Sequence, residues 1–214
     1  DVAIHYHTSE AEAQALAEEL NVQGPGTART FGGALDDPET LAPLVEAVVA
    51  DLGRLDILVN NASRFEPTPL GETDAATWDA VLDTNLRAPF LLTQAAREYL
   101  TADGGAVINL ADIHGERPLA GHTAYSVSKA ALTMLTQSLA KELGPAVRVN
   151  AVAPGVALWP EDGLTEAEKE AMLQRSVMGQ PSGAEPVAKA VHYLATADYI
   201  TGQVLGVEGG RLLY

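Results

Sequence analysis

Residues 106–112, with the sequence AVINLAD, form a nearly continuous apolar run of strand length that ends on the carboxylate Asp112. An unbroken apolar run is typical of a strand that is buried on both faces of a parallel sheet. Similar runs recur along the chain, although the second and the last are less continuous. The predicted strands are Val2-His7, Thr27-Phe31, Leu55-Asn60, Ala106-Ala111, Val147-Val152 and Val204-Val207.

Longer stretches with a helical period separate these runs. They are Glu10-Leu20, Pro38-Leu52, Asp74-Leu100, Thr123-Leu143 and Pro186-Thr196. Each is long enough to be the crossover that consecutive parallel strands require. No flexible linker, low-complexity tract or long repeat interrupts the alternation. The pattern predicts a single α/β domain over residues 1–214, built as a doubly wound parallel sheet.

Composition narrows the classes of partner. The chain has 214 residues, of which 47% are hydrophobic, and a formal net charge of -16. A surface of that sign repels nucleic-acid phosphates and anionic membranes, so we expect a small organic substrate, with no nucleic acid and no membrane as partner. The chain has no cysteine, no long apolar run and no signal-peptide pattern. We therefore expect a cytoplasmic protein.

Small or polar residues follow three of the predicted strands. They are residues 60–63 (Asn-Asn-Ala-Ser), Asp112, and Pro154 with Gly155. Ligands of open α/β sheets bind outside the carboxyl ends of the strands. The chemistry is therefore predicted to lie in these loops.

Tyr125 and Lys129 are four residues apart near the start of a predicted helix. This spacing places both side chains on one face of the helix. A phenol with a pKa of about 10 is a poor proton donor at neutral pH, but a neighbouring ammonium favours the phenolate and lowers that pKa. Taken alone, such a pair is more often a solvated helix face or a half-buried tyrosine.

The order of several motifs resembles the short-chain dehydrogenase/reductase family. The matching residues are Asn60-Asn61-Ala62, Asn85 within Thr-Asn-Leu, Tyr125-x-x-x-Lys129, Arg148-Val149-Asn150, Pro154-Gly155, Tyr199 to Gln203 and Glu208-Gly209-Gly210. The resemblance covers nearly the whole chain and implies a Rossmann-like fold. It implies that Tyr125 donates the proton, that Lys129 tunes it and holds the nicotinamide ribose, and that Asn85 supports a proton relay. Its long helices imply a homotetramer.

Asp112 departs from the usual family pattern, in which a serine thirteen residues before the tyrosine binds the substrate carbonyl. A carboxylic acid can also relay a proton and accept hydrogen bonds from the N–H groups of a heterocycle. Reduction of a C=N bond needs a proton at nitrogen, so the pair of Tyr125 and Asp112 suits a pterin ring. The alternative is that Asp112 merely caps the end of a strand.

Neighbouring residues resemble the pteridine reductases within that family. Ser63 stands where most members have glycine, and Phe65 follows two residues later. The resemblance implies that Phe65 stacks on the pterin, whereas the alternative is an ordinary core phenylalanine. Ser63 and Arg64 are candidates for contacting the polar edge or tail of the ring. Trp159 is expected to line the substrate loop.

The stretch from His5 to Ser9 (His-Tyr-His-Thr-Ser) resembles the pteridine reductase segment that receives the 2′-phosphate of NADPH. The family's arginine is Thr8 here, and its adenine-contacting aspartate is Ala34. The cofactor is predicted to be NADPH. The expected cofactor-binding residues are His7, Thr8, Ser9, Leu35, Asn61, Ala62, Ser63, Leu110, Tyr125, Lys129, Pro154, Gly155 and Val156. His5 and His7 also share a strand face and are a minor candidate for a metal pair, but no third ligand is evident, so no metal site is predicted.

No Gly-rich phosphate loop precedes the first predicted strand. In the family, a first strand, that loop and a helix hold the cofactor pyrophosphate, and the strand is central in the sheet. We therefore expect roughly 30 residues to precede Asp1 in the natural protein, which is the size of one such strand-helix unit.

The predicted activity is NADPH-dependent reduction of a dihydropterin or dihydrofolate. Protons would reach the ring by way of Tyr125 and Asp112, and the expected substrate-binding residues are Ser63, Phe65, Asp112, Tyr125 and Trp159. One alternative is a general carbonyl or ketoacyl reductase of the same family. Another is a catalytically silent sensor that binds NADP(H), and a third is an interaction scaffold. A pure sensor needs neither Tyr125, Lys129 nor Asn85.

Overall fold

The computed structural model describes residues 1–24, 26–102, 104–159 and 164–214. The strands are β1 (Val2–Tyr6), β2 (Ala28–Gly32), β3 (Ile57–Asn60), β4 (Ala106–Leu110), β5 (Arg148–Pro154) and β6 (Val204–Val207). The α-helices are α1 (Glu10–Gln23), α2 (Pro38–Leu52), α3 (Ala75–Leu82), α4 (Ala88–Ala102), α5 (Thr123–Leu143), α6 (Glu166–Leu173) and α7 (Ala184–Thr196). Three short helical segments complete the fold, namely η1 (Asp83–Arg87), η2 (Ile113–Gly115) and η3 (Arg211–Leu213).

All strand pairs are parallel, as the unbroken apolar runs predict. β1 pairs with β2, and β3, β4, β5 and β6 form a second sheet in that order. The register places Asn60 opposite Asn109 and Leu110 opposite Val152. The carboxyl ends of β3, β4 and β5 therefore meet at one edge, which brings the loops after these strands together.

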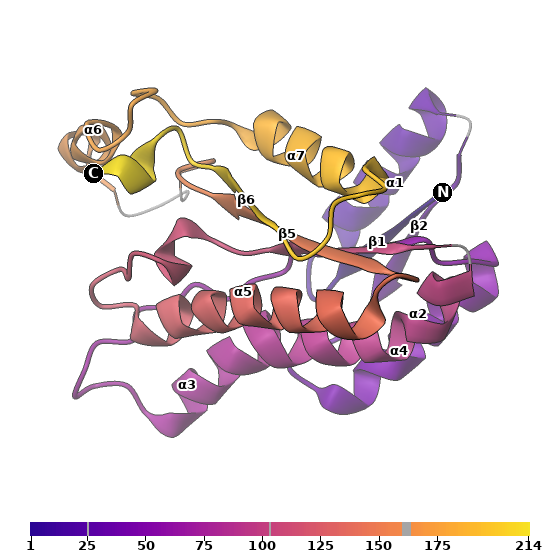
Figure 1. Ribbon diagram of the computed structural model, residues 1–214. Helices are drawn as coiled ribbons and strands as arrows, with labels where there is room; N and C mark the ends of the chain where they lie inside the picture. Colours follow the sequence, from indigo (N-terminus) through magenta and orange to yellow (C-terminus); the bar gives the residue numbers. More distant parts are fainter. Residues whose placement is uncertain (25, 103, 160–163) are drawn as a thin grey trace.

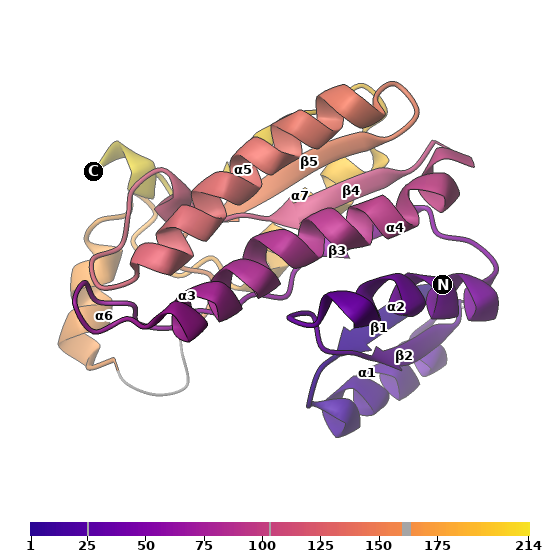
Figure 2. The ribbon, with the colours of Figure 1, turned by 90° about the horizontal axis from the view of Figure 1, so that it is seen from below.

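Helices cover both faces of the four-stranded sheet. Figures 1 and 2 show α4 and α5 on one face and α7 on the other. β4 is buried on both faces: Val107 packs in the core cluster with residues of α4 and α5, whereas Ile108 packs with Leu194 of α7. This arrangement is the doubly wound α/β fold expected from the sequence.

The sheet is split between β1 and β3. These two strands form no pair with each other, and a cavity of about 560 Å³ lies between them, with Val2, Phe31, Ile57 and Val59 among its lining residues. Ile57 is 43% exposed and Val59 is 41% exposed, which is unusual for apolar residues of a parallel strand.

Two helical features differ from the sequence expectations. The predicted helix Asp74-Leu100 is divided into α3, the π-helical segment η1 and α4. α6 lies in a region for which no helix was predicted. Its N-terminus carries a capping box, in which Thr165 and Glu168 exchange hydrogen bonds with each other's backbone. In the described part of the chain, no helix is long and apolar enough to cross a membrane.

Candidate active site

Asp112 and Tyr125 meet at the carboxyl edge of the sheet. The Tyr125 hydroxyl donates a 2.8 Å hydrogen bond to Oδ2 of Asp112, and Oδ1 of the same carboxylate accepts a 2.7 Å bond from the backbone N–H of His114. Asp112 is therefore both the N-cap of η2 and the partner of Tyr125. Because each contact uses a different carboxylate oxygen, capping of η2 does not prevent Asp112 from contacting Tyr125.

Gly115 allows η2 to lie directly on α5. A Cβ atom at this position would be 2.9 Å from the backbone nitrogen of Ala130 and from the carbonyl carbon of Lys129. Only a residue without a side chain permits that approach. The close packing places Asp112, which begins η2, beside Tyr125 in the first turn of α5.

Lys129 is 3% exposed and donates a 2.8 Å hydrogen bond from Nζ to the backbone oxygen of Leu110. Its Nζ also lies 5.5 Å from the centroid of the Tyr125 ring. Burial lowers the pKa of Lys129 to about 8, although the nearby charge of Asp112 opposes that change. The ammonium is thus positioned next to the phenol without a direct hydrogen bond to it.

The sequence-based expectation that Lys129 lowers the pKa of Tyr125 is not met in this state. Burial raises the pKa of Tyr125, and both the negative charge of Asp112 and the hydrogen bond to it raise it further. The phenol therefore remains protonated at neutral pH. The phenolate of Tyr125 is therefore costly to form in this arrangement.

Asn85 lies in η1 and is 1% exposed. Its Oδ1 accepts bonds from the backbone N–H of Arg64 (2.7 Å) and the hydroxyl of Ser63 (3.2 Å), while Nδ2 donates to the Arg64 carbonyl and to Ser128 Oγ. Single π-helical turns often occur at functional sites. In this arrangement, Asn85 fixes the loop after β3 to α5, where Ser128 lies one residue before Lys129.

Phe65 has two aromatic neighbours. Its ring stacks on His122 with centroids 4.6 Å apart and an interplanar angle of 15°, and it meets the edge of Tyr125 at 4.7 Å. Phe65 is 54% exposed, so it is not an ordinary core phenylalanine. His122 was missed by sequence reasoning. Its position three residues before Tyr125, at the N-cap of α5, is the signal that would have identified it.

Arg64 does not have a free side chain at the site. Its guanidinium forms ion pairs with Asp36 (3.4 Å) and Glu66 (2.6 Å). Trp159 is half-buried, and in the described part of the chain no ring contact joins it to Phe65 or Tyr125. Residues 160–163, which continue the expected substrate loop, lie outside the described residues.

A second cavity, of about 600 Å³, lies next to these residues, between β1, α1 and the loop after β3. It brings together five of the expected cofactor-binding residues, which are His7, Ser9, Leu35, Ala62 and Ser63. Thr8 and Asn61 are not among its lining residues, although each is adjacent in sequence to one that is.

The other expected cofactor-binding residues lie outside this cavity. Leu110 contributes its carbonyl to Lys129, while Pro154 ends β5 and Gly155 follows it at the same edge of the sheet. Val156 instead lines a third cavity, described below. Among the described residues no cluster of three or more potential metal ligands is present.

The chain is similar to several known reductases. The family profile described as Enoyl-(Acyl carrier protein) reductase matches residues 1–211. The 3-oxoacyl-acyl-carrier-protein reductase of Thermotoga maritima is 36% identical over 194 residues, covering 88% of this chain and 79% of the relative. Pteridine reductase 1 of Leishmania tarentolae is 33% identical over 253 residues, covering 99% and 88%.

A solved structure extends the likeness to three dimensions. The alternative dihydrofolate reductase 1 of Brucella canis, in complex with NADP, superimposes with a TM-score of 0.89 at 32% identity, covering 100% of this chain and 84% of that one. A profile match over nearly the whole chain, together with relatives above 30% identity, establishes the family. The chain belongs to the short-chain dehydrogenases/reductases.

Proposed function

We propose that this short-chain reductase uses NADPH to reduce a pterin or folate ring from the dihydro to the tetrahydro state. The observation that carries the proposal is the 2.8 Å hydrogen bond between Tyr125 and Asp112. A serine at position 112 would offer one hydroxyl to a substrate carbonyl. A carboxylate in contact with the phenol gives the site a second group that can bind and release a proton.

The cavity beside β1 suits the proposed cofactor. His7 and Ser9 place an imidazole and a hydroxyl at its wall, and Ser9 caps α1 without using its side chain. These groups and the first backbone N–H groups of α1 would hold the 2′-phosphate of NADPH, since helix N-termini favour anions. Glu12 also lines the cavity and opposes that charge. Leu35, which lines the same cavity, would contact the adenine, and Lys129 would hold the nicotinamide ribose.

When bound, NADPH supplies a hydride to the carbon of the ring's C=N bond. Tyr125 donates its hydroxyl proton to the nitrogen of that bond, and the electron pair of the broken O–H bond stays on the phenolic oxygen. The Lys129 ammonium stabilises this phenolate, which burial otherwise disfavours. A proton from solvent then restores the phenol. It would reach the phenolic oxygen either through the Asp112 carboxyl group or by a relay that Asn85 supports. One hydride and one proton are consumed in each turnover.

Phe65 gives the ring a surface to stack on. More than half of the surface of Phe65 is exposed while His122 packs against its ring, so Phe65 remains accessible to a substrate. A planar bicyclic ring would lie between Phe65 and the nicotinamide. Ser63, whose hydroxyl already bonds Asn85, is placed in the same loop to contact the polar edge of the ring.

Reduction of a 3-oxoacyl thioester is the second candidate. The ketoacyl reductase of Thermotoga maritima is 36% identical to this chain, whereas the pteridine reductase of Leishmania tarentolae is 33% identical. Tyr125, Lys129 and Asn85 serve a ketone as well as they serve a C=N bond. Asp112 and Phe65 are the residues that favour a pterin over a ketone.

A homotetramer is also proposed. α4 and α5 lie side by side on one face of the molecule (Figure 1), and each leaves large hydrophobic side chains exposed. The exposed fractions are 41% for Phe90, 37% for Tyr99, 44% for Val127 and 60% for Met134. Contact between such faces of two subunits would remove these side chains from water. The mass in solution, measured by light scattering, tests this proposal.

The activity is tested by following NADPH oxidation with dihydrobiopterin, dihydromonapterin, dihydrofolate and a simple β-keto ester. We expect turnover of at least one of the pterins or of dihydrofolate, with a specificity constant above that for the keto ester. Turnover of the keto ester alone would overturn the pterin assignment. Binding of NADPH with no turnover of any of the four would indicate a sensor.

A further inference from the structure

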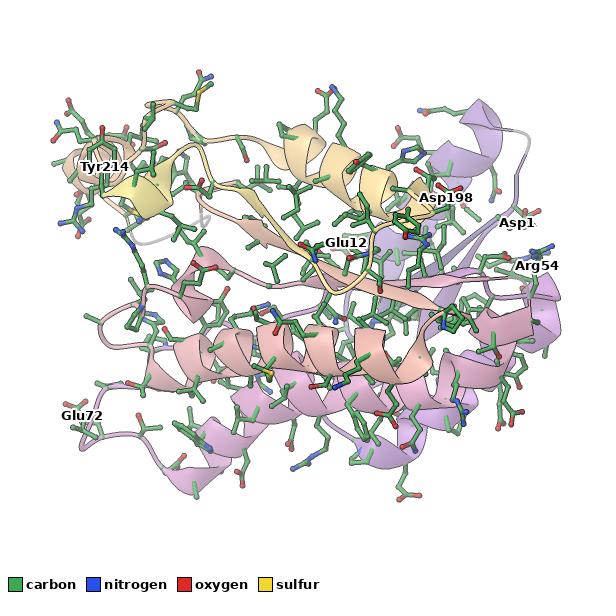
Figure 3. The ribbon with its side chains drawn as sticks, viewed as in Figure 1. Asp1, Glu12, Arg54, Glu72, Asp198 and Tyr214 are labelled. Carbon is green, nitrogen blue, oxygen red and sulfur yellow. The ribbon has the colours of Figure 1, made fainter. Side chains whose placement is uncertain are left out.

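The C-terminal turn lies at the same edge of the sheet as the proposed active site. After β6, the backbone of Glu208 packs on the loop that follows β5, where a Cβ atom at Gly155 would be 2.9 Å from the Cα atom of Glu208. Glu208 then organises η3: its Oε2 accepts a 2.8 Å bond from the N–H of Leu212, and its carbonyl accepts from the N–H of Arg211. Figures 1 and 2 show this turn at the end of the molecule that carries α6, and Figure 3 labels Tyr214 there.

A third cavity, of about 330 Å³, lies between this turn, α6 and the segment that follows α6. Met172, Leu173 and Val207 give it apolar walls, and Arg211 is the only basic residue among its described lining residues. Two hydrogen bonds to the Gly209 carbonyl, from Ser176 Oγ (2.9 Å) and from the backbone N–H of Met178 (3.0 Å), hold the two sides together. The cavity is thus built by tied segments and not by a loose loop.

Arg211 has no hydrogen-bond acceptor or ion-pair partner for its side chain in the described part of the chain, although it is partly buried. The two other arginines with a similar burial are both satisfied. Arg64 pairs with Asp36 and Glu66, and Arg148 donates 2.6 Å bonds to the carbonyls of Leu194 and Ala195. The five N–H donors of this partly buried guanidinium find no acceptor among the described residues, so they are available to bind one on a ligand.

The charges around Arg211 indicate what kind of acceptor would fit. Burial lowers the pKa of Arg211, the positive charge of Arg175 lowers it further, and Asp112 opposes both. Arg211 is therefore within electrostatic reach of Arg175 and of the Asp112 carboxylate that contacts Tyr125. Glu208 also lines the cavity, but one of its oxygens is already used by Leu212. A bound anion would offset both the free-energy cost of burying the Arg211 charge and the repulsion between Arg211 and Arg175.

We propose that Arg211 forms a subsite, to which the charge of Arg175 adds, for an anionic group on the tail of the substrate whose ring reacts at Tyr125. This inference rests on the proposed function and adds a substrate class, namely a ring that carries a carboxylate- or phosphate-bearing side chain. The apolar walls of the cavity would cover the linker between ring and anion. A folate tail supplies carboxylates, whereas a phosphopantetheine thioester, which has no ring, would supply a phosphate instead. A pterin with a short neutral side chain would leave Arg211 unpaired.

Steady-state kinetics of wild type, Arg211→Met and Arg175→Met test the subsite with four substrates. These are dihydrofolate, dihydrobiopterin, and acetoacetyl thioesters of pantetheine with and without a terminal phosphate. Arg29→Met is the control, because Arg29 is an exposed arginine on β2 that pairs with Asp51, away from the third cavity. Calorimetric titration of folate and of biopterin into the NADP-bound protein provides a readout that does not depend on turnover.

We expect Arg211→Met to raise KM for dihydrofolate and Kd for folate about tenfold, which is typical for loss of a charge-assisted hydrogen bond. Arg175→Met should have a smaller effect, and the values for dihydrobiopterin and biopterin should change less than twofold. A phosphate-dependent effect on the thioester alone would keep the subsite and overturn the pterin assignment. Equal losses with anionic and neutral substrates, or no change with any of them, would overturn the subsite while leaving the proposed function in place.

Discussion

The phenol of Tyr125 donates its hydrogen bond to a carboxylate thirteen residues earlier in the chain, at 2.8 Å from Asp112 Oδ2. The same carboxylate begins η2, which lies on α5 because residue 115 is glycine. The two side chains are therefore positioned by the packing of one short helix on one long helix. A change to that packing should therefore alter the stability of the protein, whereas a change to the carboxylate should alter the pKa of Tyr125.

Replacement of Asp112 by asparagine should lower the pKa of Tyr125 toward its ordinary value. An asparagine Oδ1 can still accept from the N–H of His114 and cap η2, but it removes the negative charge that disfavours the phenolate. Tyrosinate absorbance, recorded against pH with a Tyr125→Phe variant as the baseline, checks the direction. An unchanged or higher pKa in Asp112→Asn would show that burial alone sets the titration.

Activity should decline as the pH rises through about 8. Burial lowers the pKa of Lys129 to about 8, so the ammonium is present below that pH and is lost above it. Loss of the charge removes the group that stabilises the Tyr125 phenolate, and kcat/KM should fall on the basic side. A pH profile of kcat/KM for dihydropterin measures this limb. In Lys129→Arg, whose side chain stays charged, the decline near pH 8 should disappear. If kcat/KM of Lys129→Arg still declined near pH 8, the decline would belong to the titration of another group.

Phe65→Ala should raise KM for a dihydropterin about tenfold. The variant removes a ring whose stacking contributes about 0.5–1.5 kcal/mol beyond its area burial. Phe65→Leu, which keeps an apolar side chain but no ring, should show most of the same loss. The KM for a β-keto ester should change less than twofold in both variants. Parallel increases for pterin and keto ester would mean that Phe65 only supports the local structure.

Thr8→Arg should improve the use of NADPH over NADH. Thr8 stands where the resemblance implies an arginine, next to two residues that line the proposed cofactor cavity. An added guanidinium would bind the 2′-phosphate through charge-assisted hydrogen bonds and should lower KM for NADPH about tenfold, with little effect on NADH. His192→Arg, which adds the same charge at an exposed site on α7, is the control. A similar gain in the control would point to net charge and not to a local phosphate site.

Gly115→Ala should destabilise the protein by about 1–3 kcal/mol, because the new methyl group would overlap the backbone of Lys129 and Ala130. Urea unfolding measures the change. Gly24→Ala is a matched control, since Gly24 has a φ of -128° and a Cβ there would meet nothing closer than 3.6 Å. The control should stay within about 0.5 kcal/mol of wild type. Equal stability of both variants would show that η2 can move off α5 at little cost.

Much of the fold was predictable because the strands are local patterns. The apolar runs located all six strands of the described chain to within a few residues. The interruption of the helix over 74–100 was not predicted, since a π-helical turn depends on the tertiary contacts of Asn85 and leaves no simple pattern in the sequence. α6 was missed although the Thr165-x-x-Glu168 capping box marks its start.

The site was less predictable, because its electrostatics depend on burial. The proximity of Tyr125 and Lys129 was predictable, because a spacing of four residues on a helix is a matter of local geometry alone. The direction of the Tyr125 pKa was wrong, since it follows from the depth of the phenol and from its bond to Asp112, which are non-local. The stack of Phe65 on His122, and the lack of a partner for Arg211 among the described residues, are likewise properties of packing.

The central claim is that the carboxylate at position 112 adapts a general reductase site to a pterin ring. The most direct measurement is the ratio of kcat/KM for dihydrobiopterin to kcat/KM for a β-keto ester, in wild type and in Asp112→Ser. We predict that the substitution lowers this ratio about 100-fold, because pterin reduction loses its second proton-handling group while ketone reduction gains the family's usual serine. An unchanged ratio would contradict the account.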